Sequence, residues 1–226
     1  MKTLRCLLTV SILFTYSTSF AQAVYMEVGM NTLGSVNYSH DDLASDSDLS
    51  LSAQHRIEVG IKFKQSDRSN VTLGISTDAH SYYNSVFVPV TDDRDIEVQS
   101  LFDLNYMGAN LGFEHSVYDD EKINIHANFR LAGSILASGN RTNQALNEPS
   151  YDYMNTSSNL LLEDFRRVWV SFQIDYMISH ELSDLATLSF RHFINKNLSE
   201  NKTSSESYNF SSNAFSVGLI LYPWSE

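Results

Sequence analysis

The sequence has a single cysteine, few positive charges and no long apolar run beyond its first residues. Cys6 is the only cysteine. It lies so near the N-terminus that an exported chain would fold without any disulfide, which argues against a small disulfide-stapled secreted domain. After Ala23, no apolar run is long enough for a transmembrane helix. The 15 lysines and arginines face 27 aspartates and glutamates, for a net charge of -12. Because nucleic-acid binding rewards cationic surfaces, we expect no nucleic-acid partner.

The N-terminal residues have the pattern of a secretory signal peptide. Lys2 and Arg5 precede an apolar run at 6–14, and small and polar residues then lead to Ala21-Gln22-Ala23. This order of charge, apolar middle and Ala-x-Ala end predicts a cleaved signal peptide at 1–23 and one mature domain at 24–226. A lipoprotein signal would need its cysteine after the apolar run, whereas Cys6 precedes most of it.

Two runs of alternating apolar and polar residues occupy 104–136, joined by the acidic turn Asp119-Asp120-Glu121. Successive side chains of a β-strand point to opposite faces, so the two runs predict a hairpin with one apolar and one polar face. The apolar parity consists of Ala109, Leu111, Phe113, Val117, Ile123, Ile125, Ala127, Phe129 and Leu131. The polar parity consists of Asn110, Gly112, Glu114, Ser116, Asn124, His126, Asn128 and Arg130. We interpret this pair as a hairpin of a transmembrane β-barrel, with lipid outside and a polar lumen.

About eight such runs follow one another along the chain. They cover 24–31, 57–63, 71–76, a run starting between 96 and 105 and ending at 117, 123–136, 168–178, 188–194 and 215–221. Long connections follow the first, third, fifth and seventh runs, and short ones follow the others. This sorting predicts an all-β, eight-stranded antiparallel up-and-down transmembrane β-barrel with short periplasmic turns and long extracellular loops. A water-soluble, lipocalin-like periplasmic barrel would show the same alternation with its faces exchanged. The sorting of the loops, the small residues on the polar parity and the signal peptide favour the membrane form.

The charged residues of the polar parity predict an ion-pair network in the lumen. An eight-stranded barrel is only wide enough for side chains to fill, and an unpaired buried ion costs several kcal/mol. We therefore expect these charges to be paired, with Arg130 and Asp175 at the centre, and the lumen to be closed rather than conducting. The predicted network comprises Glu27, Glu58, Lys62, Glu114, Arg130, Arg167, Asp175 and Arg191.

Residues 102–138 and the last three strands resemble a known family. Asn105-Tyr106 leads a strand, a short acidic turn follows, and the next strand includes Ala132-Gly133-Ser134; the similarity extends to Tyr222-Pro223-Trp224. These patterns resemble the outer membrane protein beta-barrel domain family, which includes PorT-like proteins and is close in architecture to small OmpX- and OmpA-like barrels. The resemblance implies an outer-membrane location and a C-terminal aromatic residue read by the barrel-assembly machinery. Here Trp224 is followed by Ser225 and Glu226. No catalytic residue carries over.

Two further groups of residues have side chains that could support catalysis or bind a metal ion. Asp78, His80 and Ser81 could belong to a hydrolase or acyltransferase site at the rim, but neighbours along a chain do not by themselves form a triad. The acidic residues of two loops could bind calcium, yet Leu51 and Ile57 stand where the EF-hand pattern needs glycine and glutamate. The loop acids are Asp41, Asp42, Asp46, Asp48, Asp92, Asp93 and Asp95. We expect solvated acidic loops, no metal, no cofactor and no catalytic residue. An interfacial aromatic belt is predicted from Tyr82, Tyr83, Phe87, Tyr151, Tyr153 and Trp169.

The sequence therefore favours a non-enzymatic outer-membrane barrel whose long acidic loops act in surface interaction or envelope integrity. Its expected partners are the lipid bilayer, the barrel-assembly machinery and an extracellular or envelope molecule that the sequence does not identify. The alternatives are a narrow porin-like transport channel, a rim enzyme using His80, and the soluble periplasmic binding barrel.

Overall fold

The computed structural model describes residues 23–40, 50–52, 54–91, 94–120, 122–145, 156–159, 168–198, 201–202 and 206–223. Of these, 32–40, 50–52, 82–91, 94–96, 201–202 and 206–210 are described by their backbone alone. Apart from Ala23, the predicted signal peptide lies outside the described residues, as do Arg167 and Trp224. Within the described part of the chain, no helix is long and apolar enough to cross a membrane.

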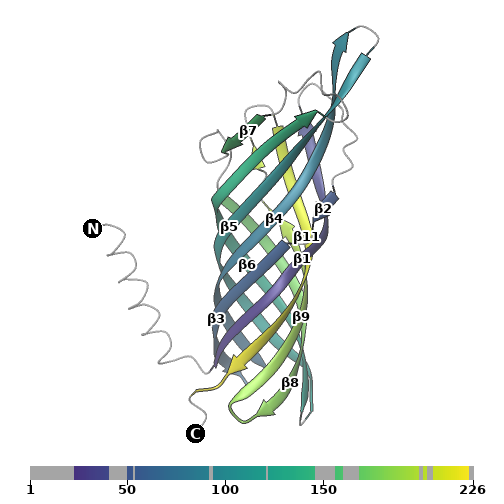
Figure 1. The fold of residues 1–226 in the computed structure, drawn as a ribbon. Coiled ribbons are helices and arrows are strands. Elements are labelled where there is room, and N and C mark those ends of the chain that lie inside the picture. The colour runs from purple at the N-terminus through teal and green to yellow at the C-terminus, as the bar shows by residue number, and fades with distance from the viewer. Residues whose placement is uncertain are drawn as a thin grey trace, which may run out of the picture.

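Eight strands close into an antiparallel barrel (Figure 1). Each pairs with the next along the chain, and β1 pairs with β11 to close the sheet, so the predicted eight-stranded fold is confirmed. The barrel strands are β1 (Ala23–His40), β3 (Gln54–Ser66), β4 (Ser69–Thr91), β5 (Arg94–Asp119), β6 (Ile123–Ala145), β8 (Val168–Ser183), β9 (Ala186–Asn197) and β11 (Glu206–Leu221). Three short strands, β2 (Ser50–Ser52), β7 (Thr156–Asn159) and β10 (Asn201–Lys202), pair with β4, β6 and β11.

The two ends of the barrel differ. At one end, here called the turn end, β3 joins β4 through Asp67 and Arg68, β8 joins β9 through Asp184 and Leu185, and β5 joins β6 through residues 120–122. β1 starts and β11 finishes at this same end. The opposite end, here called the loop end, carries the remaining connections.

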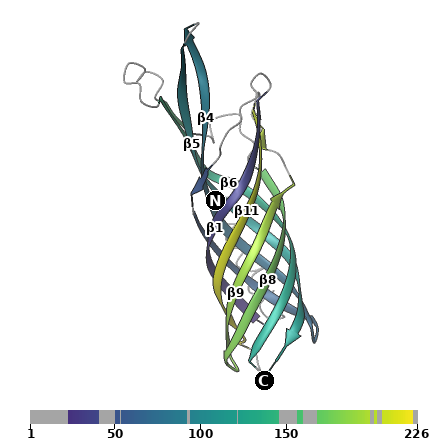
Figure 2. The same cartoon turned by 90° about the vertical axis from the view of Figure 1, so that its right-hand side faces the viewer.

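The predicted long connection between the third and fourth strands is wrong. β4 continues to Thr91 and β5 begins at Arg94, and the two form a ribbon that extends beyond the barrel at the loop end (Figure 2). In the ribbon Val86 pairs with Val98 and Val88 with Ile96. β6 likewise runs on to Ala145, and β7 lies within the predicted long connection between the fifth run, 123–136, and the sixth, 168–178. These extensions are held by backbone hydrogen bonds to a neighbouring strand. Such bonds do not require alternating apolar residues, so the pattern used to predict the strands does not detect them.

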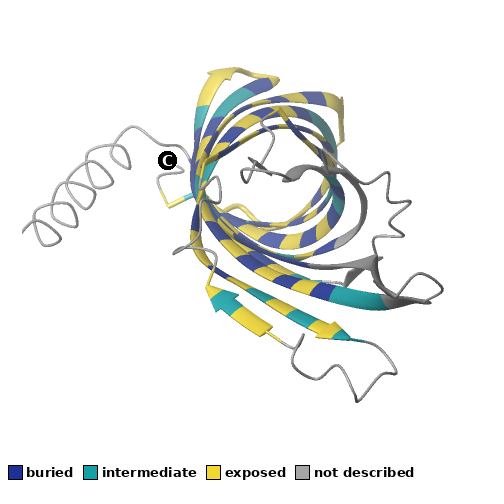
Figure 3. Ribbon diagram, turned by 90° about the horizontal axis from the view of Figure 1, so that it is seen from above, coloured by how far each residue is buried: buried dark blue, intermediate teal, exposed yellow. Residues whose placement is uncertain are grey.

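Buried and exposed residues alternate along the strands (Figure 3). The exposed parity is the apolar one, on the outer wall, and the buried parity is the charged one, in the lumen. Val217 is 52% exposed, whereas Arg130 is 3% exposed on the inner wall. A lipocalin-like soluble barrel requires the opposite arrangement, so that alternative is wrong. The exposed apolar residues include Met26, Val28, Leu73, Ile75, Met107, Leu111, Phe113, Phe129, Leu131, Ile135, Phe172, Ile174, Phe190, Ile194, Phe215 and Leu219.

Candidate functional site: a lumen filled by charged side chains

Seven of the eight residues of the predicted network lie buried on the inner wall of the barrel, and Arg167 falls outside the described residues. Each sits on the strand parity that faces the axis, because a strand turns every second side chain to the same face. The seven are Glu27 on β1, Glu58 and Lys62 on β3, Glu114 on β5, Arg130 on β6, Asp175 on β8 and Arg191 on β9.

Seven side chains form a continuous series of alternating charges across the lumen, here called the central network. Its members, in order, are Asp78, Arg56, Glu58, Arg130, Asp175, Arg191 and Glu27. Arg56 Nη1 lies 2.6 Å from Asp78 Oδ1, and Arg56 Nη2 lies 2.5 Å from Glu58 Oε2. The other oxygen of Glu58 lies 2.7 Å from Arg130 Nη1. Glu58 is thus held between two guanidinium groups.

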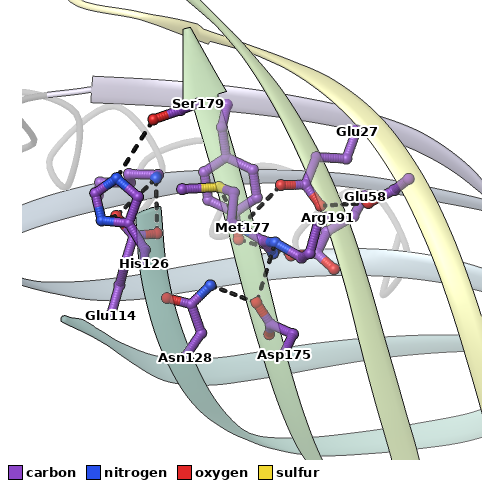
Figure 4. Close-up of polar contacts among 12 residues, drawn as sticks. Glu27, Glu58, Glu114, His126, Asn128, Asp175, Met177, Ser179 and Arg191 are labelled. Atoms are coloured by element: carbon purple, nitrogen blue, oxygen red, sulfur yellow. Dashed lines mark hydrogen bonds and ion pairs between the residues drawn. The ribbon is translucent and has the colours of Figure 1, made fainter. Parts of the chain in front are cut away.

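The second half of the central network joins β6, β8, β9 and β1 (Figure 4). Arg130 Nε lies 3.4 Å from Asp175 Oδ2, and Arg191 Nε lies 3.3 Å from Asp175 Oδ1. Arg191 Nη2 lies 2.9 Å from Glu27 Oε1. Asp175 therefore bridges two arginines, and the predicted Arg130–Asp175 pair lies within the series.

Each carboxylate of the central network also accepts a hydrogen bond from a neutral donor. Tyr25 Oη donates to Glu58 at 2.7 Å, Ser216 Oγ to Glu27 at 3.3 Å and Ser76 Oγ to Asp78 at 3.0 Å. Asn128 Nδ2 donates to Asp175. Hydrogen bonds to ionised acceptors are among the stronger ones in proteins, so these donors offset part of the cost of taking the charges out of water.

A second ion pair lies closer to the turn end. Lys62 Nζ lies 2.8 Å from Glu114 Oε2, and Asn70 Nδ2 donates to Glu114 Oε1 at 3.1 Å. His126 Nδ1 stands 3.7 Å from the same carboxylate, and its other ring nitrogen is 3.4 Å from Ser179 Oγ. The structure therefore separates Lys62 and Glu114 from the other predicted members of the network.

The sequence prediction missed Arg56, Asp78 and Tyr25. Arg56 has the same parity as Glu58, but the predicted strand begins at Ile57, and Tyr25 has the parity of Glu27 without being assigned to the predicted network. With Asp78 and Arg56 included, the buried acids outnumber the buried bases by five to four among the described residues. Extending the alternation by one pair of residues would have found Arg56.

The residues considered for a rim enzyme do not come together as a triad. Asp78 binds Arg56 and Ser76, and Ser81 Oγ donates to Asp103 at 2.7 Å. His80 packs against aromatic rings, with ring centroids 5.0 Å from Trp169 and 5.9 Å from Tyr106. Trp169 is 5% exposed and lies inside the barrel, so its predicted place in an interfacial belt is wrong.

Bulky side chains fill the lumen on both sides of the central network. Toward the loop end lies the upper layer, which consists of His80, Phe102, Leu104, Tyr106, Leu136 and Trp169. At the turn end, Ala23, Tyr25, Met177 and Ile220 form an apolar floor against which Tyr222 packs. A cavity of about 10 Å³ beside Asp78, His80 and Trp169 has room for about one water molecule. The described interior is therefore packed with side chains.

Among the described residues, no group of three or more His, Cys, Asp and Glu side chains could hold a metal ion. Of the acids considered for calcium, Asp95 is described by its backbone alone and the others lie outside the described residues. The inward charged side chains form ion pairs with one another, and their charges are neutralised within the lumen.

Tyr25 reaches Glu58 because two glycines leave room for its ring. A Cβ added at Gly60 would overlap the ring and the hydroxyl of Tyr25 and also the backbone oxygen of Leu73. One added at Gly74 would stand 2.6 Å from the Tyr25 hydroxyl. We expect Gly60→Ala to displace Tyr25 and to lower the free energy of unfolding by about 1–3 kcal/mol, the usual cost of overpacking. Urea unfolding of the reconstituted barrel measures the change.

Gly133→Ala is the matched control for Gly60→Ala. A Cβ at Gly133 would meet no atom within 4 Å, because this glycine faces outward. We expect the free energy of unfolding to change by no more than about 0.5 kcal/mol, as for surface substitutions elsewhere. Equal effects of the two variants would show that Tyr25 is not confined by Gly60.

An apolar exterior, a closed eight-stranded sheet and an ion-paired interior together define a transmembrane-type β-barrel. The chain matches no protein-family model, and no curated protein matches it. The PorT-like resemblance therefore stays a prediction.

Several solved structures align with this chain over most of its length. Neisserial surface protein A aligns with a TM-score of 0.45 at 10% identity, over 89% of this chain and 97% of that one. The outer membrane protein OprG from Pseudomonas aeruginosa aligns at 0.44 with 8% identity, over 89% and 95%. The outer membrane protease OmpT from Escherichia coli aligns at 0.43 with 8% identity, over 89% and 93%. At such similarity no activity follows for this chain.

Proposed function

We propose that this protein is an integral outer-membrane barrel that is closed to solutes and acts, without catalysis, through its loop end. The observation that carries the proposal is the distribution of side chains across the barrel wall. Residues such as Ile75, Met107 and Ile135, each more than half exposed, make the exterior apolar, while buried ion pairs fill the interior. Lipid suits such an exterior, and water does not.

The filled lumen supports a closed barrel over a transport channel. The central network crosses the lumen from β4 to β1, and the upper layer adds large rings such as Tyr106 and Trp169 between it and the loop end. A conducting pore would need a continuous water-filled path, and eight strands leave an interior that side chains fill. The ion pairs hold those side chains in place.

The loop end offers the surface for a partner. Among the described strands, the ribbon of β4 and β5 extends farthest from the barrel (Figure 2). Around its end the sequence carries Asp92, Asp93, Asp95 and Glu97 with a single arginine, Arg94. This acidic ribbon supports a role in surface interaction or envelope integrity with an extracellular or envelope partner. Export through the predicted signal peptide and insertion by the barrel-assembly machinery complete the proposal.

Two measurements on the purified protein test the proposal. After detergent extraction, we expect the unheated protein to migrate differently from the boiled protein on a gel, because a closed membrane barrel stays folded in the detergent. In planar lipid bilayers we expect no steady conductance. Identical migration of the two samples would contradict the membrane barrel. Steady conductance that changes in Arg130→Ala would establish the transport channel instead.

A further inference from the structure

A hollow of about 450 Å³ lies on the outer wall of the barrel over β3 to β6. Its floor is formed where Ala109 on β5 pairs with Gly133 on β6, so that two neighbouring outward positions carry little or no side chain. A Cβ added at Gly133 would meet no atom within 4 Å. This feature is here called the Gly133 hollow, and it lies on the outer face of the barrel wall, opposite to the face that carries the ion pairs of the lumen.

Large apolar side chains surround the Gly133 hollow. Toward the loop end, Met107 pairs with Ile135, and these side chains are 55% and 57% exposed. On the other side of the floor, Leu111 pairs with Leu131. Ile75 on β4 pairs with Ala109 and completes the wall next to β3. The hollow is therefore a gap in an otherwise continuous layer of large side chains.

A second hollow on the exterior differs in its floor. It measures about 380 Å³ and lies where β1, β9 and β11 meet. Its outward lining residues are all large, namely Val24, Met26, Val28, Leu188, Val217, Leu219 and Leu221. The Gly133 hollow differs because its two neighbouring floor positions, Ala109 and Gly133, contribute at most one methyl group, so its floor comes closest to bare backbone. It is therefore the better fitted of the two to an outside occupant.

The occupant must be apolar and must come from the surroundings of the barrel. Thr77 is the only outward side chain of the lining that has a polar atom, so a polar ligand would leave its own groups unpaired there. An empty hollow would forfeit the dispersion contacts of its whole lining. In the membrane placement proposed above, the molecules next to this wall are lipid acyl chains.

We propose that the Gly133 hollow binds one acyl chain of an outer-membrane lipid and holds it more firmly than the rest of the apolar exterior does. The proposal rests on the membrane placement of the proposed function. It predicts that one segment of the barrel wall is in longer contact with lipid than equally apolar segments elsewhere.

Photolabelling from within the bilayer tests this. The full-length barrel is reconstituted into phosphatidylethanolamine vesicles that contain a trace of phospholipid with a diazirine in the middle of one acyl chain. After irradiation, the labelled peptides are mapped by mass spectrometry. We expect label to concentrate severalfold at 107–109 and 133–135 relative to 217–219, which lies on the all-large second hollow.

Variants that fill the floor should remove this preference. We expect Gly133→Leu and, independently from the neighbouring strand, Ala109→Leu to lower the label at 107–109 and 133–135 to the level of 217–219. Val170→Leu enlarges the outward residue that pairs with Gly133 from β8 without filling the floor, and should leave the preference intact. Heat-modifiable migration identifies the variants that have folded. Because there are two filling variants on different strands, the test still works if one of them does not fold.

The outcomes separate this proposal from the one on which it rests. Uniform label along the outward residues would overturn the acyl-chain site and leave the membrane placement standing. Absence of label from every outward residue would overturn both. Label at 107–109 and 133–135 that falls below the label at 217–219, and that rises when the barrel is diluted with lipid, would show that a second copy of the chain occupies the hollow, which also overturns the proposal.

Discussion

Replacing Arg130 with alanine is expected to lower the free energy of unfolding of the barrel by about 3–5 kcal/mol, the usual cost of removing one partner from a buried ion pair. Arg130 lies 2.7 Å from Glu58 and 3.4 Å from Asp175. Its removal leaves one guanidinium group, that of Arg56, to pair with Glu58. It likewise leaves one, that of Arg191, to pair with Asp175. Both acids are then buried with too little positive charge around them.

Unfolding in urea, followed by the loss of the heat-modifiable band after reconstitution in lipid, measures this effect. The matched control is Lys64→Ala, which breaks an ion pair of similar length, 2.9 Å to Asp67, at the turn end. The Lys64 side chain is 46% exposed and that of Asp67 96%, so water replaces the lost contact and we expect no measurable change. Equal effects in the two variants would mean that the inward charges are solvated and that the lumen is open to water.

Replacing Leu111 with arginine is expected to lower the free energy of unfolding in lipid by about 2–4 kcal/mol, as for a cation at the middle of the lipid-facing wall of a barrel. Leu111 is 54% exposed and pairs with Leu73 on one side and Leu131 on the other. Its side chain therefore lies among apolar neighbours, where an arginine would have to reach past several residues to find water. This variant tests which solvent surrounds the barrel.

Leu185→Arg is the matched control for Leu111→Arg, because it places the same charge at an exposed leucine outside the lipid-facing wall. Leu185 is 56% exposed, like Leu111, but it lies in the turn between β8 and β9, so an arginine there reaches water at once. We expect a cost of at most about 1 kcal/mol, the value near the membrane interface. If Leu111→Arg proved as mild as Leu185→Arg in lipid, the exterior would not be the surface that contacts acyl chains.

Much of the fold could be predicted because side-chain direction in a strand depends only on position along the chain. The alternation through Leu111 and Phe113 is enough to place Asn110 and Glu114 on the other face. Such local rules predict the number of strands and the composition of each face. They failed where alternation stops, as in the ribbon of β4 and β5, because there the backbone of one strand is held by its neighbour.

The sequence predicted which charged residues face the lumen, but it predicted few of the ion pairs that they form. Arg130 and Asp175 were placed together because both are charged and share the inward parity. Arg56 and Asp78 were missed, since the first lay just outside a predicted strand and the second was assigned to a rim. The parity of a residue predicts whether its side chain faces the lumen. Its position along the barrel axis, and so its neighbours, depends on the register between strands.

The sequence by itself determined that the strands have one apolar face and one face of small, polar and charged residues, because the period of a β-strand turns each pattern of residues into two surfaces. Only the tertiary structure decided which surface lies inside and which ions meet. Closure of β1 onto β11 curves the sheet with its charged face inward, and the register of the strands then brings Glu27 on β1 within 2.9 Å of Arg191 on β9. Contacts of this kind follow from the way distant strands are aligned, and no local pattern of residues specifies that alignment.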